Sequence, residues 1–496
     1  MSITILSKMF GFLRDIILSY FYGASSISDA YIISITITSV LFSLIVVGIS
    51  TAYIPMYKKI EHDEGLRSAT GFTNNLMNIV LVVTTAAIIF GLVFSNILVK
   101  LFALGFDGET LETAVLFTRI ALVGVYFTSV TQIFISYLQL HGKFTVPAMI
   151  GFPFNLIIIL SIIISAQTNI TVLAIGSVIA ALVQLLFLLP SLYKIGYRYK
   201  PVIHFRDKNI KKMAVIVFPI MIGISIDQIN MMIDKTLAST LVEGGISALT
   251  YASRLNDFVQ GVFVISFVTV MFPLISNMAA KKNTEEFKES INEVISSVLL
   301  IVVPASIGIM ILSEPIIRLL FGRGHFDEHA INITSQALFF YSIGMIGYGI
   351  REILNRTFYS LQDTKTPMYN ASISVVLNII LNLLLSSFMG ISGLALATSI
   401  SAIFCSTLLL ITLRRKIGSF GLKGNFIIFI KVTLSSFVMG VIVYGLYEYI
   451  LIDWNELLKM FIVILIGSIV YFILITLLKV KESKIILKFF LSKIHR

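Results

Sequence analysis

Residues 7–23 read SKMFGFLRDIILSYFYG, and this stretch decides the class of fold. It is long and apolar enough to form most of a membrane span, because about 20 such residues cross a hydrocarbon core roughly 30 Å thick. It nevertheless contains Lys8, Arg14 and Asp15. A charge at the centre of a membrane helix costs at least about 2.5–3.5 kcal/mol, so such residues normally face a bundle interior or a water-filled cavity. We therefore expect the rest of the chain to build such a cavity around Arg14 and Asp15.

The composition of the whole chain agrees with this expectation. Of its 496 residues, 57% are hydrophobic and 13% are charged, and the mean hydropathy is +0.96. This predicts an all-α polytopic membrane protein with no separate soluble domain. The net charge of +11 comes from Lys and Arg in short loops, which is typical of membrane topology and contact with lipid rather than of nucleic-acid binding. The single cysteine, Cys405, excludes an internal disulfide.

Fourteen apolar segments are long enough to span a membrane, and Lys and Arg gather on alternate connections between them. By the positive-inside rule those connections are cytoplasmic. We therefore expect a multi-pass membrane protein with both termini in the cytoplasm. The predicted spans are 4–24, 29–55, 77–101, 112–139, 145–167, 171–193, 212–240, 247–276, 291–313, 331–361, 367–388, 391–413, 426–450 and 457–479.

An internal repeat organises these spans. When the chain is shifted by about 220 residues it matches itself weakly at several points, for example LFALG at 101–105 and LFGRG at 320–324. Six spans per repeat give two lobes of the same orientation, with the substrate path between them. The predicted domains are an N-lobe at 1–193, a basic cytoplasmic linker at 194–211, a C-lobe at 212–416, and a region at 417–496 with the last two spans and a basic tail.

Several charged residues are candidates for substrate binding. Arg14 and Asp15 lie in the middle of the first span and Arg254 lies in the eighth. An anionic ligand would satisfy two arginines that cannot neutralise each other, and the forked guanidinium suits a pyrophosphate. The alternative is a structural ion pair of Arg14 with Asp15 or Asp29. Lys8 either reaches the membrane interface or makes a first phosphate contact, and Asp29 is either a helix N-cap or part of the site.

A second group of polar residues has the chemistry of a cation site. Asp234 in the seventh span, Asn378 and Asn382 in the eleventh and Thr398 in the twelfth offer the hard oxygens that suit a small cation such as Na⁺. Asn378 and Asn382 lie four residues apart and therefore share a helix face. The alternative is a hydrogen-bonded cluster between membrane helices.

The sequence does not support an enzyme. It has no P-loop, no His-rich metal cluster and no pair of carboxylates at catalytic spacing within the spans. We therefore predict a transporter that needs no cofactor, with Na⁺ as a candidate coupling ion.

Five motifs resemble the MurJ/MviN lipid II flippases of the multidrug/oligosaccharidyl-lipid/polysaccharide exporter superfamily. They are GFLRD at 11–15, the turn around 22–30, YASRL at 251–255, LFGRGHF at 320–326 and FYSLQDTKTP at 358–367. The resemblance covers the whole chain. It implies fourteen transmembrane helices, arranged as two six-helix lobes and two additional C-terminal helices, and transport by alternating access. It also implies a location in the bacterial inner (plasma) membrane and a role in peptidoglycan biosynthesis, with lipid II and membrane lipids as partners.

The resemblance also implies roles for individual residues. Arg14, Asp15 and Arg254 match the family's central charges for the lipid II pyrophosphate, Lys8 stands where an arginine is usual, and Asp29 matches an aspartate at the outer end. A sodium site described in the family falls on Asp234, Asn378, Asn382, Thr398 and the carbonyl of Leu394, with Asn382 in place of an aspartate.

The sequence departs from the family in the second span. Phe42 and Val47 stand where the family commonly has an arginine and a glutamate. This leaves open a flippase for another polyprenyl-linked oligosaccharide, such as an O-antigen or capsule unit. A cation-coupled drug antiporter is less consistent with a cleft that contains the cationic side chains of Arg14 and Arg254. A scaffold protein for envelope assembly would tolerate the loss of both of these arginines.

Overall fold

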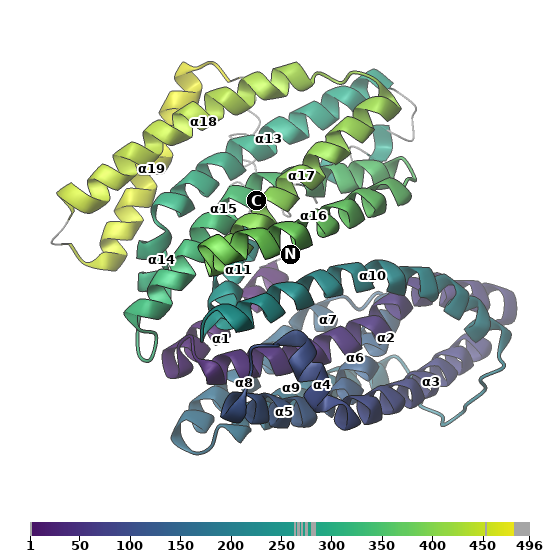
Figure 1. Ribbon diagram of the computed structural model, residues 1–496. Helices are drawn as coiled ribbons and strands as arrows, with labels where there is room; N and C mark the ends of the chain where they lie inside the picture. Colours follow the sequence, from purple (N-terminus) through teal and green to yellow (C-terminus); the bar gives the residue numbers. More distant parts are fainter. Residues whose placement is uncertain are drawn as a thin grey trace. The chain divides into compact units, whose positions relative to one another are not determined.

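The computed structural model describes residues 2–261, 264, 268, 271–272, 276–278, 284–451 and 454–480. All regular structure among these residues is helical, which confirms the predicted class (Figure 1). The chain forms two compact units. Unit 1 comprises Met1–Ser247 and Arg323–Asp327, and unit 2 comprises Ala248–Gly322 and Glu328–Arg496. Each unit is described below by itself.

Unit 1 is built around the long helix α2, which packs against α3, α5, α6 and α10. Ser25 caps α2, because its side chain accepts from the backbone N–H of Ser28 while the Ser28 hydroxyl bonds back to the Ser25 backbone. The helices are α1 (Ser2–Tyr22), α2 (Ser26–Glu64), α3 (Leu66–Val93), α4 (Ser95–Phe102), α5 (Gly108–Leu122), α6 (Gly124–Leu140), α7 (Thr145–Met149), α8 (Gly151–Gln167), α9 (Thr171–Lys194), α10 (Lys208–Leu241) and the first turn of α11 (Gly245–Gln260).

A buried aromatic cluster fixes one end of unit 1. The Tyr57 and Tyr137 rings meet edge to face at 5.8 Å between centroids, and Tyr137 meets Tyr197 at 4.9 Å. The Tyr53 hydroxyl lies 2.7 Å from the hydroxyl of Thr73 on α3. This cluster therefore joins α2, α3, α6 and the segment after α9.

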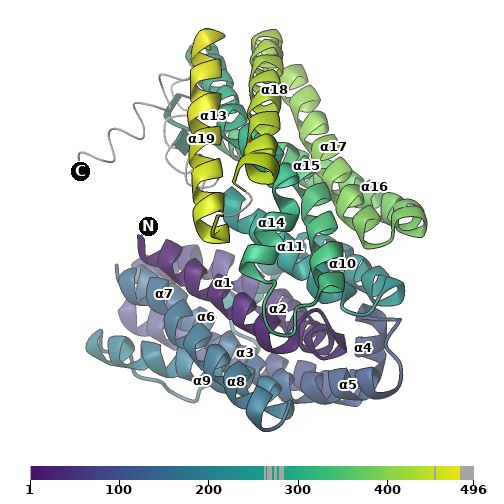
Figure 2. The ribbon, with the colours of Figure 1, turned by 90° about the vertical axis from the view of Figure 1, so that its left-hand side faces the viewer.

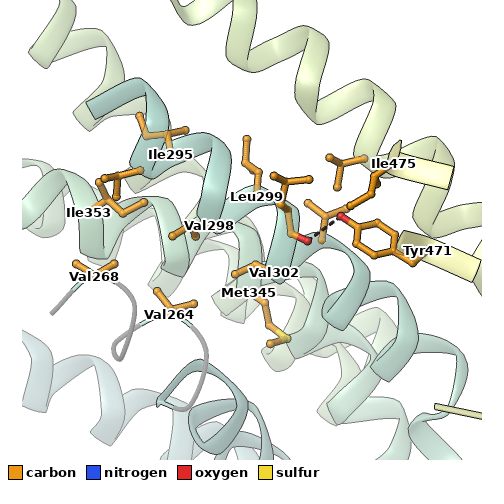
Figure 3. Packing of buried hydrophobic residues seen from close by; sticks show 14 of the residues in the cluster. Val264, Val268, Ile295, Val298, Leu299, Val302, Met345, Ile353, Tyr471 and Ile475 are labelled. Carbon is orange, nitrogen blue, oxygen red and sulfur yellow. Dashed lines mark hydrogen bonds between the residues drawn. The ribbon is translucent and has the colours of Figure 1, made fainter. Parts of the chain in front are cut away.

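A large hydrophobic cluster lies in unit 2, and in it α13 and α15 meet the last helices. Figure 3 shows Val298 and Val302 of α13 beside Met345 of α15, and the Tyr471 hydroxyl donates to the Leu300 carbonyl at 2.7 Å. The helices are the rest of α11, α13 (Thr284–Ile311), α14 (Ser313–Leu320), α15 (Glu328–Ser360), α16 (Lys365–Met389), α17 (Ile391–Ile417), α18 (Leu422–Gly445), the π-helical turn η2 (Leu446–Ile450) and α19 (Glu456–Leu477). Helices α18 and α19 lie side by side (Figure 2).

The order of helices supports the predicted repeat. In unit 1, α3 packs on α6, the short α4 packs on α5, and α8 packs on α9; in unit 2, α13 packs on α15, the short α14 packs on α15, and α16 packs on α17. Helix α10 opens the second repeat in sequence but packs along α2 and α4. Because a sequence repeat and a packing unit need not share boundaries, the predicted domain limits stay a prediction.

The membrane spans also agree with the expectation. Ten helices of the described part are long and apolar enough to cross a membrane, or eleven if α5 and α6, bent by 40° at Val123, are one span. The remaining predicted spans fall on α1, α10 and α11, and much of the part of predicted span 247–276 beyond α11 lies outside the described residues. The predicted span 77–101 was placed too late, because α3 already begins at Leu66 and a break at Phe94 separates it from α4.

Candidate functional site

Helix α1 packs along α8 (Figure 2). The Phe10 and Phe152 rings meet edge to face at 5.0 Å, and glycines allow close approach nearby. A Cβ added to Gly151 of α8 would lie 1.9 Å from the Ser7 hydroxyl of α1, and one added to Gly11 would lie 3.8 Å from the Asn155 side chain. A side chain at position 151 would therefore force the Ser7 hydroxyl to rotate away from α8. Because Ser7, Gly11 and Arg14 recur at helical spacing, the same face of α1 presents Arg14 to α8.

Arg14 is engaged on both edges of its guanidinium. Its Nε and Nη2 atoms donate to Oδ1 of Asp15 at 3.0 and 2.8 Å, and Nη1 donates to Oδ1 of Asn155 at 3.4 Å. The Arg14 side chain is 21% exposed and that of Asp15 is 10% exposed. Successive residues point about 100° apart on a helix, yet the long arginine side chain spans that angle. The geometry thus contains the Arg14–Asp15 ion pair that the sequence left as an alternative.

Two further polar residues belong to this cluster, and sequence reasoning missed both. The Asn155 amide also donates to the Gly151 carbonyl at 2.8 Å, which fixes its orientation. Tyr31 of α2 is 2% exposed, lies within electrostatic range of Arg14 and Asp15, and its hydroxyl has no hydrogen-bond partner in the described part of the chain. The available signal for Asn155 was a lone polar side chain in an apolar stretch, whereas Tyr31 stands among other polar residues of its span and gave no such signal. We call Arg14, Asp15, Tyr31 and Asn155 the arginine cluster.

The alternative that Asp29 caps its own helix is wrong, because Ser25 is the N-cap of α2. Its Oδ1 instead accepts from the backbone N–H and the hydroxyl of Ser247, at 2.7 and 2.6 Å. Asp29 is 2% exposed and Ser247 is fully buried. Asp29 therefore caps the first turn of α11, which belongs to unit 1, from a position 218 residues earlier. Lys8 is exposed on α1, which fits either of its two readings.

Close backbone contacts surround this cap within unit 1. The N–H of His325 donates to the Tyr20 carbonyl at 2.9 Å, and Gly23, at φ +60°, leaves no room for a Cβ because the His325 carbonyl oxygen would lie 2.3 Å from it. A Cβ on Gly105 would lie 2.1 Å from the Ser239 carbonyl oxygen. We call the four turns that meet here, at residues 22–26, 102–107, 239–247 and 323–327, the turn junction.

Arg254 belongs to unit 2, so the described arrangement of the arginine cluster does not include it. It is exposed on α11, whereas Tyr251 and Leu255 of the same helix are buried. The Tyr251 ring stacks on Phe321 at 5.2 Å. This packing fixes the rotation of α11 and keeps Arg254 away from the core of unit 2.

Four of the five residues proposed for sodium come together in unit 2. Asn382 Nδ2 donates to Asn378 Oδ1 at 3.0 Å, and Asn378 Nδ2 lies 3.5 Å from the Thr398 hydroxyl. Thr398 in turn donates to the Leu394 carbonyl at 3.0 Å. Their oxygens are hard ligands that suit Na⁺, but the contacts are those of the hydrogen-bonded cluster that was the alternative. Asp234 lies on α10 in unit 1.

Phe42 lies against a small apolar cluster formed by Ile88, Leu122 and Val125. An arginine at this position would have to leave that cluster or bury its charge there. The phenylalanine therefore has a packing role in this chain. The side chain of Val47 lies outside the described part of the structure.

The fold and the arginine cluster define a class: a polytopic helical membrane transporter with charged residues held inside its bundle. The chain belongs to the lipid II flippase MurJ family, whose model matches residues 18–466. It is 31% identical over 487 residues to the probable lipid II flippase MurJ of Thermotoga maritima, covering 98% of this chain and 96% of that one. The corresponding protein of Vibrio cholerae is 30% identical over 421 residues, with 82% and 80% covered.

Solved structures agree with the family. A lipid II flippase MurJ in an inward closed conformation superposes with a TM-score of 0.83 at 28% identity, covering 96% of this chain and 97% of that chain. An inward-facing multidrug resistance MATE transporter of the MOP superfamily gives 0.69 at 13% identity, with 83% and 94% covered. The second likeness concerns the fold alone.

Proposed function

We propose that this protein translocates lipid II, the undecaprenyl-pyrophosphate-linked precursor of peptidoglycan, from the cytoplasmic to the outer leaflet of the bacterial inner membrane. Membership of the MurJ family supports this function. The observation that carries the mechanism is the arginine cluster, in which a partly buried guanidinium is held between a carboxylate and an amide.

The proposed first step is an exchange of ligands at Arg14. Its Nη1 atom bonds a neutral amide oxygen of Asn155 at 3.4 Å, which is a long contact. A phosphate oxygen is charged and forms shorter, stronger bonds with a guanidinium. We infer that the pyrophosphate displaces Asn155 while Asp15 keeps the guanidinium oriented, and that Arg254 binds the second phosphate. Lys8 gives a first contact at the cytoplasmic end of α1.

Translocation then follows from alternating access. Rocking of the two lobes would expose the bound headgroup to the other side while the polyprenyl tail stays in lipid. The ligand can shift this equilibrium only by its difference in affinity for the two states. The role we assign to Asp29 is to hold the turn junction together through its bonds to Ser247 during this cycle.

The proposed orientation places both termini and the linker after α9 in the cytoplasm. The distribution of Lys and Arg supports it through the positive-inside rule. Return of the empty carrier would then be coupled either to Na⁺ held by Asp234, Asn378, Asn382, Thr398 and the Leu394 carbonyl, or to the membrane potential. The potential contributes about 2.3 kcal/mol per charge per 100 mV.

Complementation tests the function. Bacteria whose own lipid II flippase can be depleted would express the wild type, Arg14→Ala, Arg254→Ala or the control Arg67→Ala, an exposed residue of α3. We expect growth with the wild type and the control only, at equal membrane levels of all four proteins. Growth with Arg14→Glu would show that Arg14 does not bind phosphate.

The same experiment separates the second candidate, a flippase for another polyprenyl-linked oligosaccharide. The observation that favours it is Phe42 in its apolar cluster, where the family commonly has an arginine. A wild type that reaches the membrane in full amount and does not rescue growth would support this candidate. Rescue by the wild type excludes it as the sole function.

A further inference from the structure

The segment that joins α9 to α10, residues 195–207, is bound along α3 by three asparagines. We call this segment the strap. Asn74, Asn75 and Asn78 lie on α3 and are 2%, 4% and 5% exposed. The Asn74 amide donates to the Arg198 carbonyl at 3.3 Å, and the Asn78 amide donates to the Lys200 and Val202 carbonyls at 3.2 and 2.9 Å. The strap therefore follows a defined path over the end of unit 1.

The asparagine oxygens are used as fully as their nitrogens. Tyr197 donates to Asn74 at 2.7 Å and Tyr199 donates to Asn78 at 2.6 Å. The Asn75 side chain binds both backbone groups of His204: it accepts from the N–H at 2.7 Å and donates to the carbonyl at 3.1 Å. Buried amides need such partners, and here they find them in the strap backbone.

The exposed side chains of the strap and of the first turn of α10 are mainly cationic and aromatic. The Tyr199 ring is among them, although its hydroxyl is bonded to Asn78. Residues 195–212 contain six Lys or Arg and one carboxylate, Asp207. That carboxylate caps α10 by accepting from the N–H of Asn209 at 2.7 Å and of Ile210 at 3.1 Å. Two exposed aromatic residues lie between these cations: Tyr199 is 52% exposed and Phe205 is 58% exposed. The exposed cations are Arg198, Lys200, Arg206, Lys208, Lys211 and Lys212.

Membrane topology alone does not account for this arrangement. The positive-inside rule needs a number of charges near a span, and a loop without fixed structure supplies them equally well. Three buried asparagines that hold the backbone of a basic segment fix the positions of its charges as well. Aromatic rings with a polar edge lie at the level of lipid headgroups, and each Lys or Arg near an anionic surface contributes about 1 kcal/mol.

We propose that the strap and the first turn of α10 form a binding site for the phosphate headgroup of an anionic phospholipid, distinct from the arginine cluster. Arg198, Lys200 and Arg206 contact the phosphate, while Tyr199 and Phe205 contact the glycerol and the upper acyl chain. The asparagines act by positioning these cations. The proposal does not depend on the transported substrate, because it concerns a resident lipid of the membrane.

Native mass spectrometry of the full-length protein in detergent tests the site. The protein would be titrated with phosphatidylglycerol and, separately, with phosphatidylcholine. The strap variant would be Arg198→Gln/Lys200→Gln/Arg206→Gln. The matched control would be Lys143→Gln/Lys365→Gln/Lys423→Gln, which removes three exposed cations from the loop before α7 and from the first turns of α16 and α18. We expect the strap variant to lose at least tenfold in affinity for the first phosphatidylglycerol bound, and the control to lose less than twofold.

A second variant separates position from charge. Asn75→Leu/Asn78→Leu keeps every cation but removes the bonds to the strap backbone, and we expect it to lose the preference for phosphatidylglycerol over phosphatidylcholine. Equal losses in the strap variant and the control would overturn the proposal, and so would full preference in the asparagine variant. Preferential displacement of phosphatidylglycerol by farnesyl pyrophosphate from the wild type, but not from the strap variant, would assign the site to the transported glycolipid instead.

Discussion

Asp29 and Ser247 are joined by two hydrogen bonds to a single carboxylate oxygen, one from the backbone N–H at 2.7 Å and one from the hydroxyl at 2.6 Å. Both residues are buried. A carboxylate that accepts at the start of a helix satisfies an N–H that the helix itself leaves without a partner, and it interacts favourably with the helix dipole. This pair therefore secures the turn junction of unit 1.

Replacing Asp29 by alanine should lower the stability of the protein. The Ser247 N–H and hydroxyl would remain buried without their acceptor, which costs about 1–3 kcal/mol for each such group. We expect a clearly lower unfolding temperature in detergent for Asp29→Ala, and little change for Asp63→Ala, whose side chain is 50% exposed. In a double-mutant cycle with Ser247→Ala, additive losses would show that the two residues do not interact.

Asn155 should affect transport through Arg14. Asn155→Asp would place a second carboxylate beside the guanidinium, which would compete with the substrate phosphate, whereas Asn155→Ala removes one neutral contact. Transport assays in proteoliposomes should show a larger rise in KM for Asn155→Asp than for Asn155→Ala, by about tenfold if the competition amounts to about 1.4 kcal/mol. Asn332→Asp, at an exposed position of α15, serves as the control. Equal KM values for both Asn155 variants would contradict the exchange of ligands at Arg14.

Gly105 should tolerate no side chain. A Cβ at this position would lie 2.1 Å from the Ser239 carbonyl oxygen, and backbone atoms cannot move aside as a flexible side chain can. We expect Gly105→Ala to cost about 1–3 kcal/mol, as overpacking usually does. Gly71 of α3 has no atom within 4 Å of its Cβ position, so Gly71→Ala should be neutral or slightly stabilising. Thermal unfolding of both variants side by side measures the difference.

Asp363 should make stability depend on pH in the acid range. The carboxylate lies outside the spans, and its hydrogen bonds to the Lys416 ammonium and to the Thr366 backbone and hydroxyl lower its pKa to about 2. A depressed pKa contributes stability that is complete above the ordinary value of 3.8 and is lost as pH falls through about 2.

The comparison of the wild type with Asp363→Asn isolates this contribution. Because Lys416 is 42% exposed, we expect a difference in unfolding free energy of only about 1 kcal/mol near neutral pH. The difference should shrink between pH 4 and pH 2 as the wild-type carboxylate takes up its proton. A difference that stays constant down to pH 2 would mean that the charge of Asp363 does not stabilise the fold.

Local patterns predicted the helices well because long apolar segments can hardly be anything else in a membrane protein. The breaks inside spans were harder to predict. Gly124 directly follows Val123 at the bend between α5 and α6, but a single glycine in a span does not by itself predict a break. No proline or glycine stands at Phe94, so the end of α3 depends on packing with other helices. The sequence places Arg14 inside a span but does not reveal which helix it faces.

The contacts that define the site join residues far apart in the chain. Asn155 lies 141 residues from Arg14, and Ser247 lies 218 residues from Asp29. Neither pairing can be predicted from the residues around it, since single asparagines and serines are common in membrane helices and do not indicate their partners. The asparagines of α3 were missed for the same reason, because their partners are backbone groups of a segment that looked like an ordinary basic linker.

The division of the chain into units has a consequence for the turn junction. The backbone passes from one unit to the other at three places: between Ser247 and Ala248, between Gly322 and Arg323, and between Asp327 and Glu328. The last two flank a turn whose backbone is bonded to α1, and the first directly follows the residue that Asp29 holds. The three covalent crossings between the units therefore all border the turn junction of unit 1. A substitution that loosens this junction also loosens the backbone on the unit 1 side of every crossing.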